Sequence, residues 1–362
     1  MVYAMRGSVV GGCAVCYHAP QSFFSNHKRV VFRGHRTIAR ATSDIDTAKD
    51  DAIPLELDSR GIQRMAYRKE GYSSWTWNSH NINYVQAGDS GPIVLLIHGF
   101  GASVYHWRYI IPGLSEKCRV YALDCLGFGW SDKALVDYEG YGIWTNQISD
   151  FIRDVIHRDH PGEKVVLAGN SLGGYNSLAT AAVHPDLVES VILLNAAGRF
   201  DFSDAESEIE RELDAVSRAM ETVMARIKRW VVGITFLFSK QPARVVSVLK
   251  SVYHSHDNVD EELIQSILEP ADDPRASEVF YRVITSRGRP MNLLLDALQE
   301  HDMPLFLLWG SEDPWCVPAN AARIESYYGS AKKKLIVSGH CPHDDTPEVV
   351  LNEMLEYLNV NV

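Results

Sequence analysis

Short apolar runs recur along residues 92–337, and their alternation with helical patterns constrains the fold more than any other feature. The runs end next to glycine or polar residues, which is typical of strands buried on both faces of a parallel sheet. The alternation predicts an α/β fold, in which helices cover both faces of a mostly parallel, twisted sheet. The expected strands are 92–97, 119–123, 164–168, 190–194, 304–309 and 333–337, with two more at 73–78 and 81–86 around a turn at Ser79-His80.

The interval between Leu194 and Pro304 breaks this alternation. It contains charged helical patterns and one apolar run at 230–238, and an insertion of such length is usually functional. We therefore expect a helical cap at residues 199–299, inserted after the sixth strand, over the sheet edge where α/β proteins bind ligands. A core helix without a role in substrate binding is the alternative. The core then comprises residues 73–198 and 300–362.

The strand at 164–168 is followed directly by Gly169-Asn170-Ser171-Leu172-Gly173 and then by a helical pattern. This is a Gly-x-Ser-x-Gly motif in the strand–turn–helix context that exposes a serine hydroxyl. Side chains two residues before and after the serine would collide in so sharp a turn, which accounts for the two glycines. We predict that Ser171 is a nucleophile.

A carboxylate and an imidazole follow the last two expected strands. Gly310-Ser311-Glu312-Asp313-Pro314 supplies the acid, for which we prefer Asp313, with Glu312 as the rival. Ser338-Gly339-His340 supplies the base, and His343 is its rival because geometry decides between neighbours. The chain order Ser, Asp, His is that of hydrolases with an α/β sheet, so the sequence predicts a triad of Ser171, Asp313 and His340.

Backbone N–H groups complete the predicted site. The segment His98-Gly99-Phe100-Gly101 follows the first buried strand, and we expect the N–H groups of Phe100 and Leu172 to form an oxyanion hole. His98 is interpreted as a residue that fixes the turn. Acyl transfer by such a triad needs neither an organic cofactor nor a metal, and the cysteines after the first 43 residues show no metal-like pairing.

The first 43 residues contain six basic residues and no acidic residue before Asp44. An Arg-rich, acid-free leader predicts an organelle transit peptide at 1–43, and a disordered basic tail is the alternative. Residues 44–72 are expected to be a linker. The net charge of −11 argues against nucleic acid as a partner, and no apolar run is long enough to span a bilayer.

From about Trp75 onward the sequence resembles the α/β-hydrolase superfamily. The segments 166–175, 191–197 and 339–344 are similar to those of plastid pheophytinase-like hydrolases. The resemblance implies a chloroplast enzyme of chlorophyll catabolism, with Ser171, Asp313 and His340 as its triad. Its partner would be a small lipophilic carboxylic ester, such as the phytyl ester of pheophytin or chlorophyll. Peripheral contact with the thylakoid membrane is an expectation of the same kind, and the mitochondrion is the alternative location.

Three other functions stay open. One is a plastid esterase or lipase that acts on another lipid ester. Another is a non-enzymatic ligand receptor built on a hydrolase scaffold, because a fold does not fix a function. Epoxide hydrolases and haloalkane dehalogenases share this fold and cap, but they use an aspartate nucleophile, and residue 171 is serine.

Overall fold

The computed structural model describes residues 53–202, 229, 233, 235–236 and 238–360, all within one compact unit that covers residues 42–362. The expected transit peptide at 1–43 lies outside the described residues, as does most of the helical and apolar sequence at 204–238. In the described ranges, no helix is both long and apolar enough to cross a membrane.

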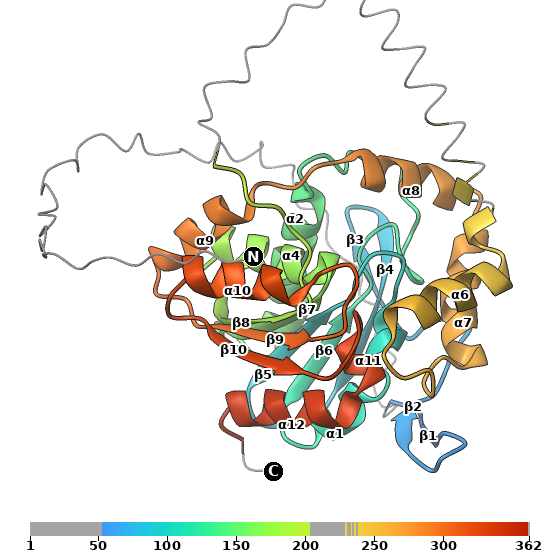
Figure 1. The fold of residues 1–362 in the computed structure, drawn as a ribbon, viewed down its shortest axis with the longest axis horizontal. Coiled ribbons are helices and arrows are strands. Elements are labelled where there is room, and N and C mark those ends of the chain that lie inside the picture. The colour runs from blue at the N-terminus through green and yellow to red at the C-terminus, as the bar shows by residue number, and fades with distance from the viewer. Residues whose placement is uncertain (1–52, 203–228, 230–232, 234, 237, 361–362) are drawn as a thin grey trace, which may run out of the picture. The chain divides into compact units, whose positions relative to one another are not determined.

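An eight-stranded sheet forms the centre of the unit, in the order β10-β9-β8-β7-β5-β6-β4-β3 (Figure 1). Only β4 pairs antiparallel, with β3 and β6, and all other neighbours pair parallel. The predicted α/β fold with a mostly parallel sheet is therefore confirmed. The strands are β3 (Ser73–Trp77), β4 (His80–Ala87), β5 (Ile93–Ile97), β6 (Arg119–Leu123), β7 (Val165–Asn170), β8 (Val188–Leu194), β9 (Leu305–Gly310) and β10 (Lys332–Ile336).

The turn between β3 and β4 lies one residue earlier than the sequence predicts. Asn78 and Ser79, both with positive φ, form it, and His80 already belongs to β4. Positive φ at both central residues gives the twist that a two-residue hairpin needs, and asparagine tolerates that conformation well.

Alternate residues of each central strand enter different apolar cores. In β5, Ile93, Leu95 and Ile97 pack on one face of the sheet, and Val94 and Leu96 pack on the other. This explains why β5, in the middle of the sheet, is apolar throughout. The first face is covered by α2 (Gly142–Phe151), α4 (Leu172–Val183), α9 (Met291–Gln299) and α10 (Pro318–Tyr327), and the second by α1 (Ile110–Ser115) and α12 (Pro347–Tyr357) (Figure 1).

Short elements connect these layers. A 3-10 turn, η1 (Val104–Trp107), follows β5, and a π-helical segment, η2 (Ile152–Ile156), and α3 (His157–Asp159) extend α2. A further short helix, α11 (Pro342–Asp345), follows the loop that carries His340.

The insertion between β8 and β9 contains α6 (Pro242–Val252), α7 (Glu261–Leu268), η4 (Pro270–Asp272), α8 (Ala276–Thr285) and α9 in the described residues. Helices α6 and α7 share a small apolar cluster of their own, which includes Val245, Leu249 and Leu263. Helix α9 differs, because Leu294, Leu295 and Leu298 belong to the main core. The expected cap range 199–299 thus ends in a helix that covers the sheet.

The expected linker at 44–72 contains a hairpin that the sequence analysis did not predict. Strands β1 (Leu55–Leu57) and β2 (Gln63–Met65) pair antiparallel. The hairpin is tied to the core because Met65 is fully buried and its N–H donates to the carbonyl of Arg108 at 2.8 Å. Strands of three residues carry too little periodicity to be recognised from sequence.

Candidate active site

Ser171 occupies a strained turn between β7 and α4. Its φ of 53° and ψ of −117° lie outside the regions that side chains favour, and such strain clusters at functional sites. A Cβ at Gly169 would collide with the backbone of Gly173, and one at Gly173 would collide with the carbonyls of Ile97 and His98. The two glycines of the motif are therefore required by close backbone packing around the serine.

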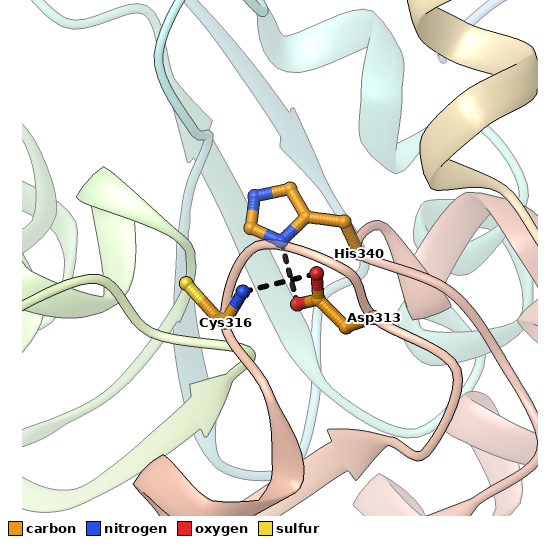
Figure 2. A group of neighbouring side chains, drawn as sticks. All are labelled: Asp313, Cys316 and His340. Atoms are coloured by element: carbon orange, nitrogen blue, oxygen red, sulfur yellow. Dashed lines mark hydrogen bonds and ion pairs between the residues drawn. The ribbon is translucent and has the colours of Figure 1, made fainter.

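Asp313 and His340 meet at the carboxyl edge of the sheet, on the loops after β9 and β10. The Nδ1 of His340 lies 2.7 Å from Oδ2 of Asp313, and both side chains are buried (Figure 2). Because a carboxylate only accepts, Nδ1 carries the hydrogen and donates it. This bond leaves Nε2 as the nitrogen that can accept a proton.

Four hydrogen bonds converge on the Asp313 carboxylate. Oδ2 accepts from His340 and from Nδ2 of Asn195 at 2.7 Å, and Oδ1 accepts from the backbone N–H groups of Trp315 and Cys316 at 2.7 and 3.0 Å. Burial acts to raise the pKa of Asp313, but the hydrogen bonds, led by that from His340, hold the pKa below its usual value. Asp313 is therefore a fixed anion that orients the imidazole.

The His340 loop is also tied to the residue before the serine. Nδ2 of Asn170 donates to the carbonyl of His340 at 2.8 Å and to that of Leu194 at 3.1 Å. Among the described residues, Ser171 Oγ and the His340 ring form no direct hydrogen bond. Such contacts are often long in ligand-free enzymes and tighten when substrate binds.

The rival residues lie elsewhere. Glu312 is exposed and its Oε1 accepts from Ser311 Oγ at 3.1 Å. His343 is buried and its ring lies against that of Trp107, with centroids 4.1 Å apart. Burial, followed by the neighbouring histidines, holds the pKa of His343 well below its usual value. The geometry thus brings Asp313 and His340 together, whereas Glu312 and His343 do not take part in this pair.

The two predicted oxyanion-hole residues are chain neighbours of Ser171 and of Gly99: Leu172 follows the serine, and Phe100 follows the glycine. Gly99 packs against the serine, since a Cβ at Gly99 would lie 3.2 Å from the Cβ of Ser171. Leu172 is the first residue of α4, so its N–H has no partner within the helix. Among the described residues, the N–H of Phe100 also has no backbone acceptor. In the described structure neither N–H group donates a hydrogen bond, which is what the predicted oxyanion hole requires.

His98 fixes the turn that carries Phe100. Its Nδ1 lies 2.7 Å from the carbonyl of Gly99, and its Nε2 accepts from the N–H of Cys125 at 3.0 Å. Burial lowers the pKa of His98, which keeps the ring neutral. The bond to Gly99 is the local contact expected from the sequence, and the bond to Cys125, which was not predicted, also joins this turn to the loop after β6.

Asp313, Cys316 and His340 offer ligand atoms within 4.8 Å of one another (Figure 2). Metal binding there would need a thiolate, but burial raises the pKa of the Cys316 thiol to about 12. It would also compete with the hydrogen bond between Asp313 and His340. The cluster fits an acid–base pair better than a metal site.

A cavity of about 150 Å³ opens beside Phe100, between the core and the insertion. Aromatic rings line one side of it, with Phe100 5.3 Å from both Phe128 and Phe280 between ring centroids. Val245 of α6 and Ile267 of α7 are also in its lining. The cavity is therefore largely apolar and adjoins the predicted oxyanion hole.

Sequence reasoning missed Asn170 and Asn195 as supports of the site. Each stands at the carboxyl end of a strand, Asn170 ending β7 and Asn195 following β8. A polar residue at the end of an otherwise apolar strand was the only available signal, and it does not say which partner the side chain has.

Comparisons with known proteins agree with this architecture. A family model described as the alpha/beta hydrolase fold matches residues 92–347. The chloroplastic pheophytinase of Arabidopsis thaliana is 28% identical over 309 residues, which cover 74% of this chain and 62% of that protein. This chain therefore spans less than two thirds of that relative's length.

A second relative is the 2-hydroxy-6-oxo-6-(2'-aminophenyl)hexa-2,4-dienoic acid hydrolase of Metapseudomonas resinovorans. It is 36% identical over 289 residues, which cover 76% of this chain and 87% of that protein. Among solved structures, a serine hydrolase involved in carbazole degradation (CarC) matches with a TM-score of 0.63 and 21% identity, over 81% of this chain and 99% of that chain. A membrane phospholipase A matches with a TM-score of 0.62 and 24% identity, over 80% and 87%. With a family model that covers most of its length and a relative at 36% identity, this chain belongs to the α/β-hydrolase family.

Proposed function

We propose that the protein is a serine hydrolase that cleaves a carboxylic ester, with Ser171 as nucleophile, His340 as base and Asp313 as the acid that orients it. The observation that carries this proposal is the 2.7 Å bond between Asp313 and His340, on a loop whose backbone accepts from Asn170, the residue before a serine held in a strained turn. An esterase needs an imidazole whose Nε2 is free to take the serine proton, and this bond selects that tautomer.

The reaction follows from these positions. Ser171 Oγ attacks the ester carbonyl while His340 Nε2 takes its proton, and the N–H groups of Phe100 and Leu172 bind the oxyanion. His340 then gives the proton to the alcohol as it leaves, and an acyl group remains on Ser171. A water molecule that loses a proton to the same nitrogen hydrolyses the acyl-enzyme. No step requires a cofactor.

The cavity beside Phe100 supports a lipophilic ester as the substrate. A cavity of about 150 Å³ holds a group roughly as large as a benzene ring. It therefore accepts one section of a large ester, and the rest would lie outside it. Burial of apolar surface contributes about 25 cal/mol per Å², which favours hydrocarbon without distinguishing one hydrocarbon from another.

The narrower form of the proposal is a plastid enzyme that removes phytol from pheophytin or chlorophyll. It is supported by the relative named chloroplastic pheophytinase and by the acid-free leader of residues 1–43. A lipophilic ester would reach such an enzyme from a membrane, so we include peripheral contact with the thylakoid in this form.

A second candidate is hydrolysis of a carbon–carbon bond in a 2-hydroxy-6-oxo-hexadienoic acid. The relative at 36% identity carries the name of such a hydrolase. Its substrate differs from phytyl esters in charge and size, so one panel of substrates separates the two candidates.

The test begins with a fluorophosphonate probe, which labels an activated serine. We expect the wild type to be labelled and Ser171→Ala to be silent. A folded wild type that is not labelled would favour a ligand receptor. Both proteins are then incubated with pheophytin a, chlorophyll a, simple lipid esters and a 2-hydroxy-6-oxo-hexadienoic acid. Release of phytol by the wild type alone supports the narrow form, and cleavage of the dienoic acid alone contradicts it.

A further inference from the structure

The loop that carries His340 is hydrogen-bonded to the insertion as well as to the sheet. The N–H of His340 donates to the carbonyl of Val252, the last residue of α6, at 2.7 Å. Asp345, at the end of α11, accepts from the N–H groups of His254 and Ser255 at 2.9 and 2.8 Å. These three bonds join the histidine loop to the connection between α6 and α7.

The same carboxylate also holds the beginning of the histidine loop. Oδ2 of Asp345 accepts from the N–H of Gly339 at 2.7 Å and from Oγ of Ser338 at 2.9 Å. Ser338 is fully buried and Asp345 is nearly so. One buried carboxylate thus binds donors on the loop residues before His340 and donors on the insertion.

A second set of contacts strengthens the same junction. Oδ2 of Asp344 accepts from the hydroxyl of Tyr253 at 2.9 Å, and its Oδ1 accepts from Nε of Arg108 at 3.0 Å. Arg108, which is fully buried, also pairs with Asp260 at 2.7 Å. The segment from Val252 to Asp260 is therefore fixed to the histidine loop at several points along its length.

We infer that Asp345 is a positioning residue that sets the place of the His340 imidazole through the α6–α7 connection. The inference rests on the proposed function, because it assigns a role within that site. Asp313 fixes the Nδ1 side of the ring, and Asp345 fixes the backbone from which the ring extends. Since residues of α6 and α7 also line the cavity beside Phe100, a substrate section bound in that cavity would contact the same helices that hold the His340 loop.

The test is Asp345→Asn. Whichever way the new amide turns, its NH2 group faces at least one N–H donor, so one or more of the four bonds is lost. Misplacement of a catalytic group lowers rate more than binding, so we expect kcat on a short ester to fall about tenfold while KM stays within about threefold. The low-field proton resonance of the His340–Asp313 bond should shift or broaden.

Glu269→Gln is the matched control. Glu269 joins the insertion to the core through the hydroxyl of Tyr67 at 2.6 Å, and its side chain does not bond the histidine loop. We expect wild-type kcat and an unchanged resonance. Ser338→Ala is the milder second variant, because it removes only the hydroxyl donor to Asp345 and should move both readouts in the same direction by less.

The outcomes separate this inference from the proposed function. If the wild type is not labelled by the fluorophosphonate, the proposed function fails, and the resonance still decides whether Asp345 positions His340. A folded Asp345→Asn with wild-type kcat and an unmoved resonance overturns the inference. If Asp345→Asn does not fold, wild-type values for Ser338→Ala overturn it instead.

Discussion

Asn195 holds the Asp313 carboxylate from the neighbouring strand: its Nδ2 lies 2.7 Å from the oxygen of Asp313 that accepts the hydrogen of His340. Its Oδ1 accepts from the N–H of Gly310 at 2.8 Å, so one buried amide fixes both the acid and the turn that leads to it. The orientation of the imidazole therefore depends on a residue more than a hundred positions away in the sequence.

Replacement of Asn195 by alanine should lower the activity of the folded enzyme, beyond any loss that follows from a lower free energy of unfolding. A hydrogen bond to a charged group contributes about 1.5–3 kcal/mol, so we expect kcat/KM of Asn195→Ala to fall at least about tenfold. Asn176→Ala is the control, because Asn176 is equally buried in α4 and its amide has no hydrogen-bond partner in the described structure. Steady-state kinetics on one ester would contradict the prediction if both variants lost activity equally.

Gly173→Ala should destabilise the protein and abolish activity. The added Cβ would meet the carbonyl oxygens of Ile97, at the end of β5, and of His98, in the turn that follows, so the backbone must move. Overpacking costs about 1–3 kcal/mol in general, and this contact lies at its upper end. Gly142→Ala is the matched control, since nothing lies near its Cβ position at the start of α2. Urea unfolding gives the free energy of unfolding of both variants, and equal values would contradict this prediction.

Stability should fall with acidification below about pH 6.5. Burial lowers the pKa of His98, His106 and His343, to about 3 for His106, so all three stay neutral in the folded protein. In the unfolded chain they bind protons near pH 6.5, and since the unfolded state then holds more protons, the free energy of unfolding decreases as pH falls. Each histidine contributes a slope of about 1.4 kcal/mol per pH unit between the two pKa values.

His343→Phe is the variant that tests this account. Phenylalanine keeps a ring against Trp107, and the Nδ1 that it removes has no hydrogen-bond partner in the described structure. We measure the free energy of unfolding by urea between pH 7.5 and 5.5. We expect its dependence on pH to be weaker in His343→Phe than in the wild type, by about the contribution of one histidine. An unchanged slope would mean that His343 does not contribute to the acid sensitivity.

Filling the cavity should lower activity on large substrates and spare activity on small ones. Ile267→Trp places an indole in the cavity lining, so kcat/KM on a long-chain ester should fall about tenfold, whereas hydrolysis of an acetate ester should change little. Ile284→Trp is the same substitution on the exposed face of α8, and it should leave kcat/KM on both esters unchanged. Parallel loss on both esters in Ile267→Trp would point to general disruption and not to a lost binding site.

Much of the fold could be predicted from sequence because its strands are buried on both faces. In the run 119–123, the four residues that follow Arg119 are apolar and buried, and the structure places β6 at that range. The serine turn could be predicted for a similar reason, since Gly169 and Gly173 are local requirements of its backbone.

The supports of the site could not be predicted. Asn195 and Asp345 act through hydrogen bonds to distant residues, Asp313 in one case and His254 in the other. Local patterns contain no information on such pairs. The same holds for α9, whose amphipathic pattern fits a cap helix and a core helix equally well, and the packing of Leu294 and Leu295 decides between them.

The order of the strands along the chain also sets when the site can work. The turn of Ser171 and the turn of Phe100 lie in the first part of the core, whereas His340 follows β10, the last strand. As a nascent chain leaves the ribosome, the serine emerges long before its imidazole, and domains fold only when their segments are available. Under the proposed mechanism, the nascent protein therefore becomes catalytically active only after its C-terminal end has left the ribosome. A messenger RNA truncated before the codons of β10 would then yield an inactive product.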